Sequence, residues 1–286
     1  YISNQLMFLS LAARLGVRVE RAGDLSEGGV DPDAVRALVR RHRPRLVALT
    51  WVPTNTGLVQ PAALVGAVCE EAGVPFLLDA CQAAGQLPIQ MGALKCDFLS
   101  TTARKFLRGP RGIGFLCVSD AALARGAYPL LVDMRGASWT ASDAFELADG
   151  ARRFEQWECA CALVLGLGAA ARYALDAGVE RTSERAHALA REARGRLAGI
   201  PGVRTLDHGA HLSAIAAFEC AGRDAADVML ALRARGINTS AQSRGDALLD
   251  LDRKGASSLL RVSPHYFNTL EELDILEGAL RELMRA

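Results

Sequence analysis

The chain has 286 residues, of which half are hydrophobic and 23% are charged, so one or two domains with a large buried core are expected. The formal net charge is +1 and the two signs are interspersed, which argues against a nucleic-acid partner. No apolar run reaches transmembrane length, and no internal repeat or low-complexity segment is evident, so no membrane partner is predicted.

The seven cysteines show no Cys-x-x-Cys spacing, which is typical of small buried side chains in a reducing compartment. We therefore expect a cytoplasmic protein. The sequence opens without Met and without a signal-peptide pattern, inside what looks like a helix, so we expect further residues before Tyr1. The histidines lack ligand spacing with acids or cysteines, and no metal site is predicted.

Strand and helix patterns alternate in the first part of the chain. The expected elements are helices at 4–15, 31–42 and 61–73, and strands at 17–21, 45–50, 75–79, 98–100 and 115–118. This order predicts an α/β domain with a largely parallel sheet, in which ligands bind at the carboxyl ends of the strands. Thr50, Asp79 and Ser100 fall at such ends.

The pattern after Val118 is sparser. Residues 128–150 show no periodicity, and 241–256 are typical of a polar loop. Helices are expected at 154–178, 179–197, 224–235 and 269–284, and strands at 214–219, 237–240 (an edge strand) and 259–263. The last helix begins with a capping box formed by Thr269 and Glu272. We predict a large domain over 1–177, incomplete at its N-terminus, and a small α+β domain over 178–286.

The stretch DFLSTTARKFLRGPRGIGFLCV (97–118) places Lys105 in a glycine-rich turn between two apolar strands. Burying a lysine is costly, although the side chain can also extend from a loop edge to water, and this stretch alone leaves that alternative open. Upstream, PFLLDACQAAGQ ends an apolar strand at Asp79, followed by Gln82. A buried acid and a buried lysine at successive strand ends form the arrangement that pyridoxal phosphate (PLP) needs.

Together with RVSPHYFNT (261–269), these motifs resemble the class V aminotransferases of PLP fold type I. The resemblance extends from the first helix to the last. With RVSPHYFNT, the segments VPTNTGLVQPA, LLDACQAAGQ, ARKFLRGPRGIGF and GINTS most resemble the isopenicillin-N-epimerase-like branch. Within that branch, the resemblance is closest to the PLP-dependent C–S lyases of ergothioneine biosynthesis. The resemblance implies an α/β PLP-binding domain, a small C-terminal domain and a homodimer with shared active sites. It also implies that the phosphate-binding turn and the ring that stacks on PLP lie before Tyr1.

The resemblance assigns roles to three residues of the large domain. Lys105 would bind the PLP aldehyde covalently and then act as the base that removes the Cα proton. Asp79 would keep the pyridine nitrogen protonated, although an Asp after a strand can also cap a helix. Gln82 would donate a hydrogen bond to the phenolic oxygen of the cofactor; its alternative is a solvated glutamine.

Further cofactor contacts are implied less directly. Thr102 and Arg104 stand where the family usually has Ser and His, and both would bind the cofactor phosphate. Thr54, and after it Asn55, would contact a cofactor oxygen. Arg261 would clamp the substrate α-carboxylate, with a surface strand arginine as the alternative.

The resemblance predicts a PLP-dependent β-elimination that cleaves the C–S bond of a cysteine conjugate or its sulfoxide and releases pyruvate and ammonia. An aminotransferase or an amino-acid epimerase would use the same residues and remains an alternative. Cysteine desulfurases of the family need a persulfide-forming cysteine before the carboxylate arginine, and residues 238–258 contain none. A non-catalytic scaffold or an inactive truncated chain is a further alternative.

Overall fold

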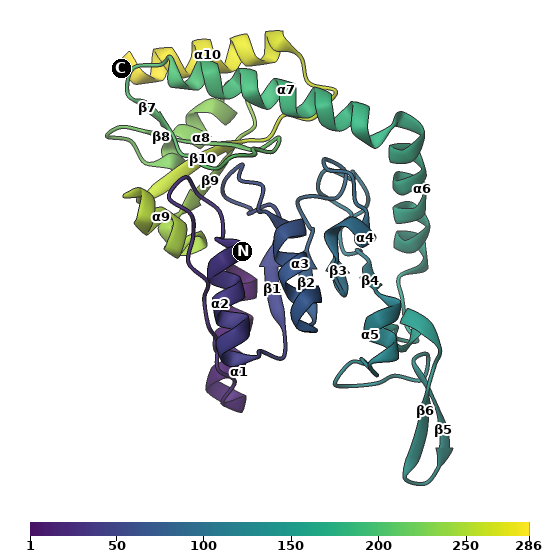
Figure 1. Ribbon diagram of the computed structural model, residues 1–286. Helices are drawn as coiled ribbons and strands as arrows, with labels where there is room; N and C mark the ends of the chain where they lie inside the picture. Colours follow the sequence, from purple (N-terminus) through teal and green to yellow (C-terminus); the bar gives the residue numbers. More distant parts are fainter. Residues whose placement is uncertain (286) are drawn as a thin grey trace. The chain divides into compact units, whose positions relative to one another are not determined.

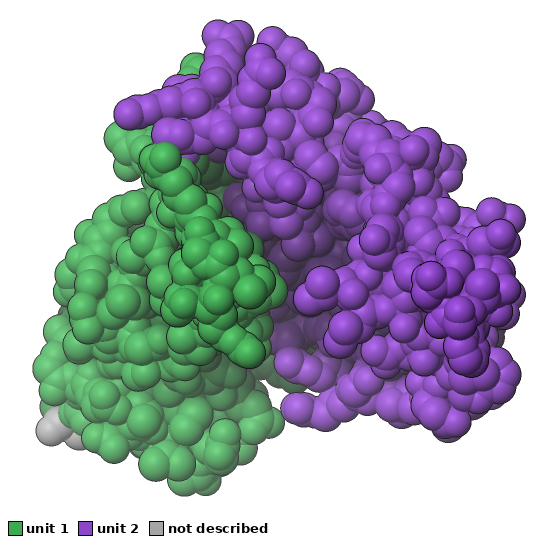
Figure 2. Space-filling view, turned by 90° about the horizontal axis from the view of Figure 1, so that it is seen from below, with its two compact units in different colours: residues 1–34, 52–60, 178–286 green, residues 35–51, 61–177 purple. Residues whose placement is uncertain are grey.

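The computed structural model describes residues 1–285, which form two compact units. Unit 1 comprises residues 1–34, 52–60 and those from 178 onward, and unit 2 comprises residues 35–51 and 61–177 (Figure 2). Unit 1 therefore resumes at Gly178, beside the predicted boundary at Ala177, but it also takes in two earlier stretches of the chain. The predicted division into 1–177 and 178–286 stays a prediction.

Unit 2 is built on a four-stranded sheet in the order β1-β2-β3-β4, in which β1, β2 and β3 are parallel and β4 is antiparallel to β3 (Figure 1). Its core includes Phe76, Leu78 and Leu99, which are fully buried. The strands are β1 (Val47–Thr50), β2 (Phe76–Asp79), β3 (Phe98–Ser100) and β4 (Leu116–Val118), and the helices are most of α2 (Pro32–His42), α3 (Ala62–Ala72), α4 (Met91–Leu94), α5 (Asp120–Ala124) and α6 (Cys161–Ala177).

The register of the parallel strands aligns their carboxyl ends. Thr50 pairs with Asp79, and Asp79 pairs with Ser100, so the last residues of β1, β2 and β3 are level with one another. The sheet thereby brings three polar side chains, far apart in sequence, to one edge, where α/β sheets bind ligands.

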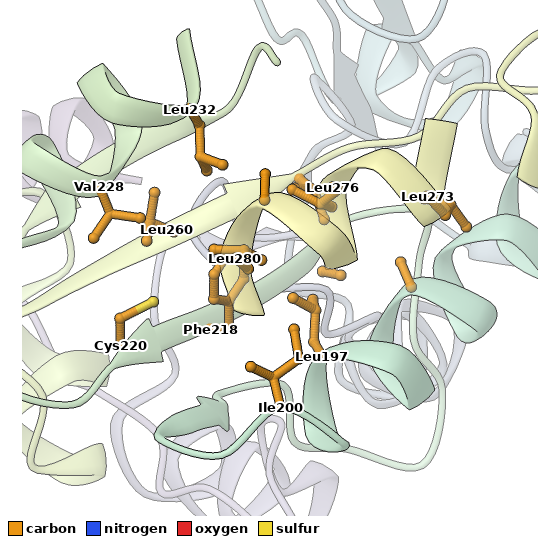
Figure 3. Packing of buried hydrophobic residues seen from close by; sticks show 14 of the residues in the cluster. Leu197, Ile200, Phe218, Cys220, Val228, Leu232, Leu260, Leu273, Leu276 and Leu280 are labelled. Atoms are coloured by element: carbon orange, nitrogen blue, oxygen red, sulfur yellow. The ribbon is translucent and has the colours of Figure 1, made fainter. Parts of the chain in front are cut away.

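Unit 1 contains an antiparallel sheet in the order β7-β8-β10-β9 and a hydrophobic cluster on one face of it (Figure 3). Phe218 and Leu260 from the sheet, with Leu197, Leu232 and Leu280 from the helices, are 2% exposed or less. The elements are α1 (Ile2–Leu15), α7 (Val179–Ala198), β7 (Val203–Thr205), β8 (Ala216–Cys220), α8 (Ala225–Arg233), β9 (Ser240–Ser243), η2 (Arg244–Asp246), α9 (Leu248–Lys254), β10 (Ser258–Val262) and α10 (Leu270–Arg285).

The start of α10 follows the predicted capping box. The backbone N–H of Thr269 donates to the Glu272 carboxylate at 2.8 Å, and the N–H of Glu272 donates to Thr269 Oγ1 at 3.4 Å. The opposite face of the sheet carries a second cluster, formed by Leu206, Ala217, Leu251, Ala256 and Leu259. The small α+β architecture expected for the second half is thus present in unit 1.

Several predicted elements differ from the structure. Residues 17–21 form no strand, and 128–150 contain an antiparallel hairpin, β5 (Ala137–Ala141) and β6 (Ala144–Leu147). Most side chains of this hairpin are exposed, so it lacks the alternation of apolar and polar residues that marks a half-buried strand. The helix expected at 154–178 begins only at Cys161, because a 3₁₀ turn (η1, Gly150–Phe154) and irregular chain precede it.

Differences of the same kind occur in unit 1. The edge strand is at Ser240–Ser243 instead of 237–240, the polar loop 241–256 includes α9, and β7 has no counterpart among the expected elements. The polar sequence of β9 gives no strand signal by itself. Over the described residues, no single helix is long and apolar enough to cross a membrane.

Candidate functional site

Lys105 lies in a tight turn that follows β3. The N–H of Ala103 donates to Ile113 O at 2.9 Å, and the N–H of Gly109 donates back to Ala103 O at 2.8 Å, which closes a loop around Lys105. Its neighbours Ala103 and Phe106 are buried, and Lys105 itself is partly buried. The turn therefore holds this lysine against the carboxyl edge of the sheet and not on an open loop.

The return strand from this turn passes close to β3, and a glycine permits it. A Cβ atom on Gly114 would lie 2.1 Å from the carbonyl oxygen of Thr101, inside any allowed contact. The glycine-rich sequence after Lys105 thus allows the close antiparallel pairing that fixes the turn.

Asp79 ends β2 and is oriented by hydrogen bonds from both sides. Its Oδ1 accepts from the backbone N–H of Cys81 at 3.0 Å, and its Oδ2 accepts from Thr50 Oγ1 at 3.3 Å. The described chain forms turns directly after Asp79 and no helix, so the alternative of a helix cap does not hold. The neighbouring strand β1, through Thr50, thus helps to fix the carboxylate; the sequence places Thr50 at a strand end, but only the register reveals this contact.

Gln82 carries a buried donor without a partner. The side chain is 4% exposed, and its Nε2 has no hydrogen-bond partner among the described residues. The Gln82 backbone carbonyl accepts from Gln86 Nε2 at 2.6 Å, which holds the turn in place. A buried unsatisfied donor costs about 1–3 kcal/mol, so this amide is positioned for an acceptor from outside the chain.

The pKa of the Cys81 thiol depends on the charged side chains around it. Burial raises the pKa of the Cys81 thiol to about 12, and the Asp79 carboxylate also raises it, whereas Lys105 and Arg104 act in the opposite direction. The carboxylate after β2 and the two cations after β3 therefore lie within electrostatic reach of a single thiol. Arg104 is exposed and Thr102 is partly buried. The structure gathers five predicted residues, Asp79, Gln82, Thr102, Arg104 and Lys105, on two adjacent segments of unit 2.

Arg261 lies on β10 in unit 1 and is not a surface strand arginine. Its Nη1 donates to the backbone carbonyl of Thr54, and its Nε is buried without a partner among the described residues. Burial lowers the pKa of the Arg261 guanidinium, with no carboxylate of the described chain acting against that shift. A buried cation of this kind is suited to an external anion, because Nε and Nη2 form one edge of the planar guanidinium.

Thr54 and Asn55 belong to unit 1 as well. Asn55 is 7% exposed, and its Nδ2 donates to Asp246 O at 2.9 Å; two residues on, the N–H of Gly57 donates to Asp207 Oδ1 at 2.7 Å. These bonds hold the segment next to η2 and β10. A contact of Thr54 or Asn55 with the cofactor stays a prediction.

Comparison with known proteins gives the following relatives. A probable cysteine desulfurase of Methanothermobacter thermautotrophicus is 28% identical over 98% of this chain and 70% of that protein. A probable hercynylcysteine sulfoxide lyase of Mycobacterium tuberculosis is 30% identical over 95% of this chain and 65% of that protein. The chain spans only 35% of a probable cysteine desulfurase of Mycolicibacterium paratuberculosis, to which it is 31% identical.

Solved structures agree on the fold. The apo structure of a cysteine desulfurase from Thermococcus onnurineus NA1 matches with a TM-score of 0.90 and 25% identity, over 99% of this chain and 70% of that one. A cystine C–S lyase in complex with cysteine persulfide matches with a TM-score of 0.78 over 97% of this chain and 72% of that one; at 24% identity this shows the fold alone. The predicted α/β fold of PLP fold type I is confirmed.

The sequence profile described as aminotransferase class-V matches residues 1–276, nearly the whole chain. The match agrees with the motifs around Asp79, Lys105 and Arg261, which lie inside it. The chain therefore belongs to the aminotransferase class-V family.

Proposed function

We propose that this chain is a PLP-dependent lyase that cleaves the C–S bond of a cysteine conjugate, or of its sulfoxide, by β-elimination. The overall reaction uses water and releases the sulfur-containing leaving group, pyruvate and ammonia. The observation that carries the cofactor assignment is the buried Gln82 Nε2 without a partner in the described chain. Gln82 lies on the segment that carries Asp79, and at Gly85 this segment meets the backbone of the Lys105 turn.

The residues of unit 2 fit the functional groups of PLP. Gln82 Nε2 supplies a donor for the phenolic oxygen, Asp79 a carboxylate for the pyridine N–H, and Lys105 an amine for the aldehyde. Thr102 and Arg104 precede the lysine in the same turn and supply a hydroxyl and a cation for the phosphate. Each group of the cofactor that these residues address has the matching charge or hydrogen-bonding type.

When bound, PLP supplies an electron sink for the negative charge that develops at the substrate Cα. Asp79 stabilises that charge by keeping a proton on the ring nitrogen, and the hydrogen bonds from Thr50 and Cys81 hold its carboxylate in place. Lys105 Nζ would hold the cofactor through its aldehyde and would also be the base that takes the proton from the substrate Cα. Expulsion of the sulfur group then needs only a substrate with sulfur on Cβ.

Arg261 is proposed to bind the substrate α-carboxylate. Its guanidinium is buried, its Nε has no partner among the described residues, and Thr54 O holds Nη1. A two-point ion pair fixes the carboxylate, and with it the direction of the Cα–H bond relative to the cofactor. The remaining predicted contacts, Thr54 and Asn55 with a cofactor oxygen, belong to the same proposal.

The choice between sulfur chemistries rests on cysteine placement. Most of the relatives are named as cysteine desulfurases, and one as a hercynylcysteine sulfoxide lyase. No cysteine occurs between Asn238 and Ser258, where the family's desulfurases carry theirs, and Cys220 is 5% exposed with a pKa raised to about 11 by burial. These features favour elimination over persulfide formation, and a sulfoxide of an imidazole-bearing cysteine conjugate, as in ergothioneine biosynthesis, is our proposed substrate.

The first test is spectroscopic. The protein with added PLP is expected to show an absorbance band near the boundary of the visible and ultraviolet ranges, and Lys105→Ala is expected to lose it. The neighbouring Arg108→Ala serves as the control, since no cofactor contact is proposed for it. An identical band in Lys105→Ala would refute the cofactor assignment, and no band in any form would favour a scaffold or an inactive chain.

The second test separates the reactions by product. With cysteine S-conjugates, cystine and amino-acid/keto-acid pairs, the lyase is expected to release pyruvate and ammonia. Alanine with a persulfide would indicate a desulfurase, and amino-group transfer without pyruvate an aminotransferase. Asp79→Asn is expected to keep the PLP band but to lower kcat by about 100-fold or more, because the ring nitrogen loses its charged partner. Full activity in Asp79→Asn would contradict the proposed role.

A further inference from the structure

Cys159 and Cys161 form an exposed pair of thiols in unit 2. All seven cysteines lie within the described residues, and the other five are buried or partly buried. The two Sγ atoms are 3.9 Å apart, so the side chains face one another across a single intervening residue. The proposed elimination uses neither thiol. The pair is therefore a cluster of nucleophilic groups that the proposed function leaves without a role.

The two cysteines lie on chain of different regularity. Cys161 is the first residue of α6, and the backbone N–H groups of Leu163 and Val164 donate to Ala160 O at 2.8 and 3.1 Å, which anchors the start of the helix. Cys159 precedes the helix on irregular chain. The side chain of Cys159 can therefore rotate toward a partner whose backbone is held in place.

A disulfide between the two thiols needs only a small movement. The Sγ atoms of a disulfide are about 2 Å apart and its Cα atoms about 4.4–6.8 Å apart, and the Cα atoms of residues two apart in a chain are separated by at most about 7 Å. The Sγ atoms therefore have to approach by about 2 Å from their present separation. An exposed disulfide in so small a ring is of the readily reduced kind, so its formation is reversible.

The surroundings of the pair favour redox chemistry over metal binding. Within the described residues, no group of three His, Cys, Asp or Glu side chains is placed to hold a metal ion, so the pair lacks the further ligands that zinc needs. Cys161 raises the pKa of the Cys159 thiol, first through their hydrogen bond and then through its charge, whereas Arg135 acts in the opposite direction. The pair thus ionises one thiol at a time, which provides a single thiolate beside a thiol.

We propose that Cys159 and Cys161 are a reversible redox site that reduces low-molecular-weight disulfides and closes to an intrachain disulfide. One thiolate attacks a sulfur of an external disulfide, R–S–S–R, so that a mixed disulfide forms and R–S⁻ leaves. The second thiol loses its proton and attacks the protein sulfur of the mixed disulfide, which expels the other R–S⁻. The two departing thiolates take up the two protons that the pair gives up. Two electrons thereby pass from the pair to the external disulfide, which leaves as two thiols.

The probe is oxidised glutathione, mixed with reduced glutathione in graded ratios and incubated with the full chain. The reaction is quenched with acid, and the protein is unfolded, alkylated with iodoacetamide and cleaved with trypsin. Residues 154–172 form one tryptic peptide, which contains both cysteines and no other. This peptide is expected to become two hydrogen atoms lighter and to escape alkylation, and dithiothreitol is expected to reverse both changes. A disulfide between two chains, or no change at any ratio, would overturn the proposal.

Serine variants test the second step. Cys159→Ser and Cys161→Ser each leave a single exposed thiol, so both are expected to stop at the mixed disulfide with glutathione. Cys117→Ser is the matched control, because Cys117 is a partly buried cysteine of β4 and burial raises the pKa of its thiol. The control is expected to close the intrachain disulfide as the unchanged chain does. A mixed disulfide that persists in the unchanged chain as it does in the two serine variants would contradict the proposal.

Comparison with the unfolded chain isolates the contribution of the structure. The sequence alone places the two cysteines one residue apart, so the chain in urea can close the same ring. Because the folded chain already holds the Sγ atoms 3.9 Å apart, its equilibrium constant for closing the disulfide is expected to be about 10-fold greater than that of the urea-unfolded chain. Equal constants would show that folding does not build the redox site and would overturn the proposal.

Discussion

Cys81 combines a nucleophilic side chain with surroundings that suppress its reactivity. It follows Asp79 by two residues, and burial together with that carboxylate raises the pKa of its thiol to about 12. The thiolate is the reactive form of cysteine, so this thiol is protonated at neutral pH despite its place between Asp79 and Lys105. A protonated thiol beside the cofactor residues avoids side reactions with the cofactor aldehyde.

This protection predicts a slow reaction of Cys81 with iodoacetamide. A raised pKa means that the thiolate fraction is small below about pH 12 and grows roughly tenfold per pH unit. At pH 8, we expect Cys81 in the folded chain to be alkylated about 1,000-fold more slowly than in the urea-unfolded chain. Site-resolved mass spectrometry measures both rates, and similar rates in the two states would contradict the structure around Asp79.

At the scale of an element, the turn that presents Lys105 depends on a glycine from another segment. Gly85 has φ = +90°, and a Cβ atom there would lie 2.4 Å from the backbone oxygen of Phe106. The turn after β2 and the turn after β3 therefore touch backbone to backbone, next to the lysine. This contact links the segment of Asp79 and Gln82 to the segment of Lys105.

Gly85→Ala is expected to destabilise the fold and to weaken PLP binding. Gly126→Ala is the matched control, because Gly126 has φ = +78° but a Cβ atom added there would have no described atom within 4 Å. The control should lower the free energy of unfolding by about 1–2 kcal/mol, the cost of holding an alanine at a positive φ. Gly85→Ala should lower it by more, because the backbone of the neighbouring turn must also move. Urea unfolding measures the free energy of unfolding of both variants. Equal decreases would show that the contact between the two turns does not contribute to stability.

The elements also show what sequence alone can predict. The sequence predicts the strands that end at Thr50, Asp79 and Ser100 within two residues of their observed bounds, because each is an apolar run that ends in a polar residue. It misses the hairpin β5–β6 and displaces strand β9, because their exposed or polar residues carry no periodic signal.

The candidate site, too, can be predicted from the sequence only in part. The motifs around Asp79, Lys105 and Arg261 are visible in the sequence as residue types at given spacings. The hydrogen bond from Thr50 to Asp79 is not, because it depends on which strands pair and in which register. Register is a property of long-range pairing, which local patterns do not encode.

At the scale of the whole molecule, the hairpin β5–β6 of unit 2 extends beyond its four-stranded sheet (Figure 1). Large apolar side chains in and before this hairpin are exposed. Leu130, Leu131 and Trp139 are 92%, 85% and 81% exposed. A two-stranded hairpin is marginally stable in water without a further surface to pack on, and exposed apolar groups of this size mark interaction sites. The homodimer that the family resemblance predicts would cover these side chains with a second copy of the chain.

Multi-angle light scattering is expected to give a dimer for the unchanged chain. Leu131→Glu is expected to raise the dimer dissociation constant by about 100-fold, because covering a leucine is worth about 1.5–3 kcal/mol and burying an unpaired carboxylate adds a further cost. Leu249→Glu is the matched control, since Leu249 is a 52% exposed leucine of α9 in unit 1, away from this segment in sequence. A monomeric unchanged chain would refute the homodimer. If both variants dissociate the dimer equally, the hairpin segment is not the interface, because the effect of the added charge does not depend on where it is placed.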